Sequence, residues 1–232
     1  MSLKLFDLAG AEDDRRFSPY CWIARLAIAH KGLPVETVPW RFTEKDAISD
    51  SGQGAVPVLQ DGDKTIHDSW AIAEYLEEAY PDQPSLFGCE MSKGQARFFQ
   101  TWVEQTLRSK LVPIIILDLA ENLHEKDRAY FIETRTKRFG MSLEEFANSS
   151  PEQVQAFQDS LGPVRQVLTQ QDYICGANPG YADYILLAIF QWARCSCPVA
   201  LLTEEDPVFA WRDRMLNLFD GLAGKAKGYP VI

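Results

Sequence analysis

Strand-like segments occur only in the first 80 residues of this chain, and that asymmetry limits the folds it can adopt. Four short runs have the character of strands: LKLFDL at 3–8, VETVP at 35–39, VPVLQ at 56–60 and KTIHD at 64–68. Asp61-Gly62 between the last two is a typical hairpin turn. Helical patterns over 19–31 and 69–80 complete the order β-α-β, then β-β-α. Residues 1–80 are therefore predicted to form a small α/β layer.

The rest of the chain has only helical signals. A linker over 81–90 begins with PDQPSLFG, and helical patterns then run over 91–118, 126–147, 151–170, 181–197 and 205–220. Pro113 is expected to kink or split the first of these helices. Residues 91–232 are predicted to form an all-helical domain of about five helices, which makes the fold class α/β plus all-α.

Length, charge and cysteine content narrow the classes of function. The 232 residues suffice for one large or two small domains, and a formal charge of −10 argues against binding nucleic acid. Five irregularly spaced cysteines do not suggest a disulfide scaffold, and Cys195-Ser196-Cys197 lacks a second pair at metal-ligand spacing, so no metal is expected. The sequence has no long apolar run and no secretion signal, so we expect a cytoplasmic protein outside the membrane.

Ser18-Pro19 is the first candidate for chemistry, because it follows the first strand and starts a helix. Serine at the N-cap and proline at the next position start a helix well without any further role. The alternative interpretation, a role in ligand binding, is based on location, since ligands of α/β sheets bind beyond the carboxyl ends of the strands. A helix N-terminus favours an anion there, and a serine hydroxyl can donate a hydrogen bond to it.

Two further residue pairs can also be interpreted either as purely structural or as part of a ligand site. Val56-Pro57 lies at a strand, where proline is usually confined to an edge. A cis bond would turn the Val56 backbone outward toward an extended ligand, whereas a trans edge proline would have no such role. Asp68-Ser69 starts the next helix, and the pair either only caps it or also holds a carboxylate and an ammonium group.

The order of these motifs resembles that of the glutathione S-transferase superfamily. The motifs are Ser-Pro-Tyr-Cys at 18–21, Val-Pro at 56–57, Asp-Ser-x-Ala-Ile-x-x-Tyr-Leu at 68–76 and Gly-Tyr-Ala-Asp-Tyr at 180–184. The resemblance covers essentially the whole chain and implies a thioredoxin-like domain over 1–80 and a helical domain over 91–232. The stretches FSPYCWIARLAIAHKGL and DSWAIAEYL are most similar to a bacterial and fungal serine-type branch that includes glutathione-dependent β-aryl etherases.

This resemblance implies a role for each motif. Ser18 would hydrogen-bond the sulfur of glutathione and favour the thiolate, which then attacks a hydrophobic electrophile, with an aryl ether as one candidate. The backbone of Val56, with Pro57 as the cis proline, would pair with the cysteinyl part of glutathione. Asp68 and Ser69 would bind its γ-glutamyl end.

The first long helix of the helical domain is expected to supply the second-substrate pocket. The candidates are Trp102, Leu107, Leu111 and Ile114, although such residues are more often core. The segment EDDRR at 12–16 is either a solvated loop or a lid over the site. The resemblance also implies a homodimer.

Two residues depart from the family pattern. Ala55 stands where members often have Lys or Arg for the glycine carboxylate of glutathione, and Lys45, Arg41 or Gln53 are the substitutes to consider. Gly180 replaces the usual Ser or Thr before a later helix, so that helix start must rely on Asp183 and the backbone.

Two alternatives to a transferase remain open. One is a non-catalytic module of the same fold that binds hydrophobic ligands or a protein, which the missing basic residue at Ala55 favours. The other is a thiol–disulfide reductase, which the serine at position 18 disfavours, because the first cysteine of a Cys-x-x-Cys motif is the reactive one. Cys21, at the later position of that motif, is expected to be a small core residue.

Overall fold

The computed structural model describes residues 3–230, and its N-terminal part is built on a mixed sheet of four strands. The strands are β1 (Leu3–Leu8), β2 (Val35–Trp40), β3 (Val58–Asp61) and β4 (Lys64–His67), in the order β2-β1-β3-β4. β1 pairs with β2 in parallel and with β3 in antiparallel, and β3 pairs with β4 in antiparallel. A 3-10 helix, η1 (Lys45–Ser51), lies between β2 and β3.

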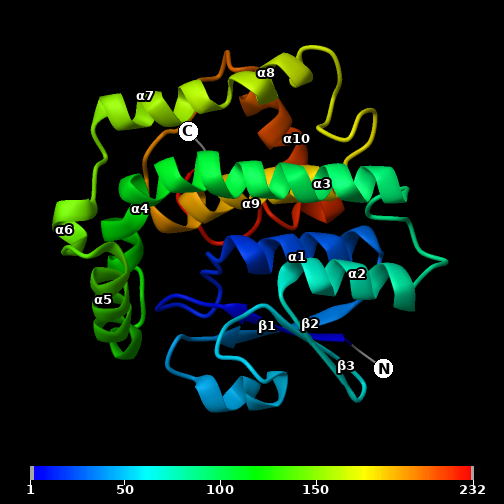
Figure 1. The fold of residues 1–232 in the computed structure, drawn as a ribbon, viewed down its shortest axis with the longest axis horizontal. Helices are drawn as coiled ribbons and strands as arrows, with labels where there is room; N and C mark the ends of the chain where they lie inside the picture. The colour runs from blue at the N-terminus through cyan, green and yellow to red at the C-terminus, as the bar shows by residue number, and fades with distance from the viewer. Residues whose placement is uncertain (1–2, 231–232) are drawn as a thin grey trace.

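Helices α1 (Pro19–His30) and α2 (Ser69–Ala79) separate the sheet from the helical part of the molecule (Figure 1). Both begin with the caps that the sequence predicts, because Ser18 and Asp68 each accept a hydrogen bond from a backbone N–H of the first turn. The apolar side of α1, which includes Trp22, Leu26 and Ile28, is completely buried.

The C-terminal part contains only helices. They are α3 (Glu90–Trp102), the π-helix η2 (Val103–Arg108), α4 (Ser109–Glu121), α5 (Glu125–Phe139), α6 (Leu143–Phe146), α7 (Pro151–Ser160), α8 (Gly162–Leu168), α9 (Tyr181–Ser196) and α10 (Pro207–Gly221). α9 is buried along nearly its whole length and packs against α1, so it joins the two parts. α5 extends down beside the sheet domain at the left of Figure 1, with α6 above it. The predicted fold class, α/β followed by all-α, is confirmed.

The helices are interrupted at more points than the sequence pattern suggests. Pro113 lies inside α4 without ending it, and the change of winding comes earlier, in the π-helical turn η2. The expected helix over 126–147 is divided, because Gly140 adopts a φ of +73° and ends α5. The expected helix over 151–170 is divided at Leu161, just before Gly162-Pro163.

The start of α9 has the Asp183 cap that the sequence predicts. The Asp183 carboxylate accepts hydrogen bonds from the backbone N–H groups of Gly180 and Ile174, at 3.1 and 2.7 Å. It also accepts the Trp211 indole N–H from α10 at 2.9 Å. Asp183 therefore compensates for the missing Ser or Thr at position 180 and ties α9 to α10. No helix within residues 3–230 is long and apolar enough to cross a membrane.

Candidate functional site

Two cavities meet where the sheet domain contacts the helical domain. The larger has a volume of about 540 Å³ and lies between the start of α1 and helices α4, α5 and α6. The smaller has a volume of about 430 Å³ and lies between the start of α2 and helix α3. Tyr20, Ala55 and Val56 line both cavities. Both volumes lie in the range typical of small-molecule sites.

Ser18 lines the larger cavity at the N-terminus of α1. Only 5% of the residue is exposed, and its Oγ accepts a hydrogen bond from the Cys21 N–H at 3.4 Å. Since this cap uses an oxygen lone pair, the hydroxyl hydrogen remains available to donate to an anion. The helix N-terminus adds positive potential at the same place.

Val56 and Pro57 line the smaller cavity, and the peptide bond between them is cis. Within residues 3–230, no backbone hydrogen bond outside the regular helices and strands uses the N–H or C=O of Val56. An extended peptide lying in this cavity would find both groups available.

Asp68 lines the smaller cavity, and it has an uncommon backbone conformation with a φ of +74°. Its Oδ1 accepts hydrogen bonds from the N–H groups of Trp70 and Ala71, at 2.9 and 3.2 Å. Ser69 is 1% exposed and does not line either cavity. Its hydroxyl has no hydrogen-bond partner within residues 3–230, which is rare for a buried polar group.

Helix α3 and the start of η2 form the opposite wall of the smaller cavity with four polar residues that were not predicted from the sequence: Arg97, Gln100, Thr101 and Glu104. Their spacing of three, four and seven residues is the signal that could have identified them, since it places them on one helix face. The Arg97 guanidinium lies over the Trp70 ring, 4.7 Å from its centroid.

The three proposed substitutes for the missing basic residue at Ala55 have different surroundings. Lys45 lines the larger cavity, where its ammonium donates to the Gly54 carbonyl. Gln53 lines the smaller cavity, and its amide donates to the Ala55 carbonyl at 2.7 Å. Arg41 lines neither cavity and is paired with Asp13. Lys45 and Gln53 are therefore the groups placed to meet a carboxylate beside Ala55.

The structure corrects the expected wall of the second-substrate pocket. Leu107, Leu111 and Ile114 are buried in the core, Trp102 packs against Phe99, and none of the four lines either of these two cavities. The same stretch of chain instead presents Arg108, Ser109, Val112, Ile116 and Leu119 to the larger cavity. The residues that line the cavity lie about one position, or about 100° around the helix, from the residues expected from the sequence.

Cys21 is completely buried beneath the Ser18 turn. Burial, and then the negative charge of Asp7, raise the pKa of the Cys21 thiol well above its usual value. A thiol in that environment is not a nucleophile at neutral pH, which agrees with the predicted core role.

No residue of the segment 12–16 lines either cavity, so the structure gives no support to a lid. The Arg16 guanidinium reaches the buried carboxylate of Asp7 at 3.4 Å, and Arg25 reaches the same oxygen at 3.3 Å. Burial raises the pKa of Asp7, while the two guanidinium groups act in the opposite direction. This ion cluster fixes the base of the loop.

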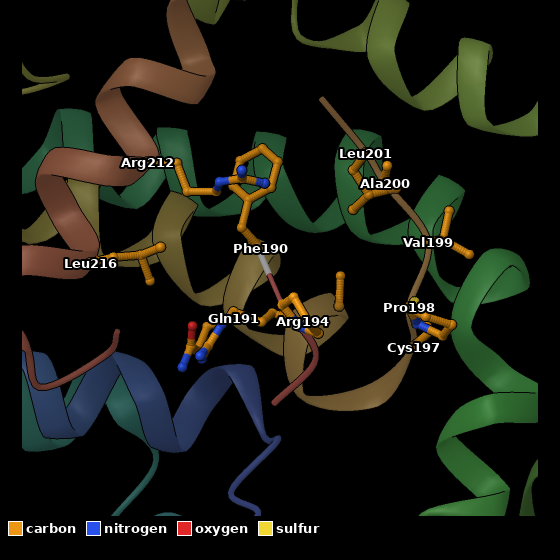
Figure 2. A pocket seen from close by; sticks show the side chains of 12 residues that line it. Phe190, Gln191, Arg194, Cys197, Pro198, Val199, Ala200, Leu201, Arg212 and Leu216 are labelled. Carbon is orange, nitrogen blue, oxygen red and sulfur yellow. The ribbon is translucent and has the colours of Figure 1, made fainter. Parts of the chain in front are cut away.

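A third cavity, shown in Figure 2, is too small for a substrate. It has a volume of about 30 Å³, close to the space of a single water molecule. Gln191 and Arg194 from α9 and Arg212 from α10 surround it with the segment 197–201. Within residues 3–230, no group of three or more His, Cys, Asp or Glu side chains is arranged to hold a metal ion.

Comparison with known proteins gives matches to both parts of the chain. Residues 14–84 match the family profile of the glutathione S-transferase N-terminal domain, and residues 95–207 match that of the C-terminal domain. The glutathione S-transferase-like protein ustS of Aspergillus flavus is 30% identical over 138 residues, 54% of this chain and 49% of that protein. Glutathione transferase omega-1 of Caenorhabditis elegans is 25% identical over 178 residues, 76% of this chain and 60% of that protein. The matched parts thus span about half to three-fifths of these relatives.

Solved structures have the same overall fold. A glutathione S-transferase of Ceriporiopsis subvermispora in complex with glutathione has a TM-score of 0.84 at 22% identity, over 98% of this chain and 99% of that one. The β-etherase LigF of Sphingobium sp. strain SYK-6 has a TM-score of 0.65 at 20% identity, over 94% of this chain and 96% of that one. At these identities the likeness concerns the fold alone. With both domain profiles matched in order and the fold shared along the whole described chain, the protein belongs to the glutathione S-transferase superfamily.

Proposed function

We propose that this protein is a glutathione-dependent transferase in which Ser18 stabilises the thiolate of bound glutathione. The observation that carries the proposal is the position of the Ser18 hydroxyl. It lies at a helix N-terminus in the wall of the larger cavity, and its hydrogen is not used by the helix cap. Ser18 itself is not the nucleophile.

Glutathione fits the smaller cavity by chemistry. The free backbone groups of Val56 match the two amide hydrogen bonds that an extended cysteinyl unit can make. The γ-glutamyl end has an ammonium, for which Asp68 and Glu104 are complementary partners, and a carboxylate, for which Arg97 is complementary. The Ser69 hydroxyl, expected from the sequence to bind the same carboxylate, is buried and lines neither cavity, so it is not part of this proposal. The glycine carboxylate would lie near Lys45 or Gln53.

The chemistry requires a thiolate at neutral pH. A free thiol has a pKa of about 8.5, so only a small fraction is ionised at pH 7. Lowering that pKa by about two units, through the Ser18 hydroxyl and the helix N-terminus, makes the thiolate the major form. The sulfur then bonds to an electrophilic carbon in the larger cavity, and the leaving group departs with the bonding electron pair. With an aryl ether as substrate the leaving group would be an aryloxide.

Replacing Ser18 with alanine tests this role. We expect kcat/KM for a general electrophile to fall by roughly 10²–10³, by analogy with the loss of one oxyanion-hole donor. The variant also loses a helix cap worth about 1 kcal/mol. Ser150→Ala is the matched control, because Ser150 also precedes a proline, caps α7 and lines neither cavity. Full activity of Ser18→Ala would reject the proposed role.

Retention on immobilised glutathione separates the transferase from a non-catalytic binding module. We expect the protein to be retained and to turn over a general electrophile. Failure in both assays would favour the module, in agreement with the missing basic side chain at Ala55. We further propose that the protein is a cytoplasmic homodimer.

A further inference from the structure

The larger cavity has a strongly cationic wall on the side of the helical domain. Arg108 from η2 and Arg135 and Arg138 from α5 line it. Lys45, from η1 of the sheet domain, also lines the cavity and is one of the two groups proposed above to lie near the glycine carboxylate of glutathione. Four cations around one cavity are unexpected in a chain with a formal charge of −10.

Protein carboxylates do not neutralise this wall. None of the described residues that line the cavity is Asp or Glu, and none of the three arginines forms a salt bridge within residues 3–230. The Arg108 Nε is buried without a hydrogen-bond partner in the same part of the chain. Burial lowers the pKa of Arg135, and the charges of Arg138 and Arg108 lower it further. Arg108 and Arg135 are half-buried while Arg138 is exposed. Partly buried cations close together without counter-charge are costly, and an anionic ligand would reduce that cost.

Aromatic rings form the rest of this wall. The rings of Phe139 and Phe146 are stacked, with centroids 3.9 Å apart and an interplanar angle of 5°. The Arg135 guanidinium lies 4.7 Å from the Phe131 ring centroid, and that of Arg108 lies 5.7 Å from the Trp192 ring centroid. Such a wall accepts a flat ring beside a negative charge.

We propose that the second substrate is an aromatic electrophile that carries a carboxylate, held by Arg108, Arg135 and Arg138. This inference names the substrate class of the transferase site and so rests on the proposed function. A guanidinium presents two parallel N–H donors that match the two oxygens of a carboxylate. An aromatic ring held between these arginines and Ser18 would present its far edge to the glutathione sulfur.

A chlorodinitrobenzoate and the corresponding neutral chlorodinitrobenzamide form a matched pair of probes. In both, the glutathione thiolate forms a carbon–sulfur bond, the carbon–chlorine bond breaks, and chloride leaves with the bonding pair. Equilibrium binding of each probe, followed by quenching of tryptophan fluorescence, needs no turnover. Turnover is then measured for each probe and divided by its uncatalysed rate with glutathione.

We expect the benzoate to bind the wild-type protein roughly tenfold or more tightly than the amide, as for charge-assisted hydrogen bonds. Arg108→Met and Arg135→Met keep most of the side-chain length and should each reduce this preference several-fold to tenfold. Arg135→Lys should retain part of it. Arg128→Met is the matched control, because Arg128 is exposed on α5, donates to the Glu121 carbonyl and does not line the cavity.

The outcomes separate the two proposals. Equal binding of benzoate and amide, or an unchanged preference in both methionine variants with unaltered thermal stability, would reject the carboxylate site. A clear preference for benzoate without turnover of either probe would support the anionic site and reject the transferase function.

Discussion

Asp68 combines two features that a helix cap alone does not require. Its φ of +74° lies where residues other than glycine are uncommon, and its carboxylate faces the smaller cavity while Oδ1 caps α2. Unusual backbone conformations of this kind persist where the surrounding structure fixes them, and they cluster at ligand sites.

Asp68→Asn separates the two functions of this residue. Asparagine caps helices as well as aspartate and tolerates a positive φ, so the free energy of unfolding should hardly change. The lost negative charge should raise the KM for glutathione roughly two- to fivefold, since the side chain is exposed. Steady-state kinetics with glutathione as the varied substrate gives the value. An unchanged KM would leave Asp68 with a capping role alone.

At the scale of residues, the sequence was informative wherever one local rule decides the structure. The caps at Ser18 and Asp68 follow from the residue type and its position before a helix, and the cap by Asp183 follows from its position in the first turn of α9. The placement of Lys45 and Gln53 beside Ala55 depends on how the segment between β2 and β3 folds back, which no local pattern specifies. Arg41 looked equivalent in the sequence and is engaged elsewhere.

At the scale of elements, the helix that runs through η2 and α4 shows how far sequence periodicity can predict which side chains line a site. It is apolar on adjoining faces, because Leu107, Leu111 and Ile114 point into the core while Val112, Ile116 and Leu119 line the larger cavity. Periodicity identifies such a helix but does not choose between two apolar faces. The π-helical turn then brings Arg108 to the cavity, and that winding was not visible in the sequence.

The end of α1 contains a group that couples stability to pH. His30 Nε2 lies 3.0 Å from the Ser85 carbonyl, and Nδ1 lies 2.5 Å from the Tyr184 hydroxyl of α9. These partners suit a neutral ring that donates from Nε2 and accepts at Nδ1. Burial lowers the pKa of His30 below its usual value of 6.5.

The sign of the effect follows from proton binding. Below about pH 6.5 the unfolded chain binds a proton at His30 that the folded protein binds less readily, so the free energy of unfolding falls as pH falls. His30→Gln should flatten this loss. Urea unfolding between about pH 8 and about pH 5 measures how the free energy of unfolding depends on pH. His67→Gln is the control, because His67 is exposed. The same slope in both variants and the wild type would contradict the assignment.

At the scale of the whole molecule, the site exists because two domains meet. Ser18 and Val56 come from the sheet domain, while Arg97 and Arg135 come from the helical domain. The packing of α9 against α1 fixes the distance between these walls. The order of a sheet domain and a helical domain could be predicted from the sequence pattern. Which residues line the cavities between the domains depends on tertiary packing, and only the family resemblance indicated the general location of the site.

Helix α3 has an exposed apolar face beside its polar cavity face. Met91 is 74% exposed and Phe98 is 76% exposed, more than any other large apolar side chain in residues 3–230. They are seven residues apart and therefore lie on the same side of the helix. Exposed apolar side chains aligned in this way are typical of surfaces that bind another chain. We infer that this face belongs to the interface of the proposed homodimer.

Phe98→Glu tests this interface. A buried carboxylate without a partner on each side of the two-fold axis should shift the protein from dimer to monomer, because both copies contribute the same charge to one self-complementary surface. Analytical ultracentrifugation should then give a mass near 26.3 kDa, the mass of one chain, and about twice that value for the wild type. Met141→Glu is the control, since Met141 is 44% exposed and lies after α5, outside α3. A wild-type monomer, or a Phe98→Glu dimer of unchanged affinity, would exclude α3 as the interface.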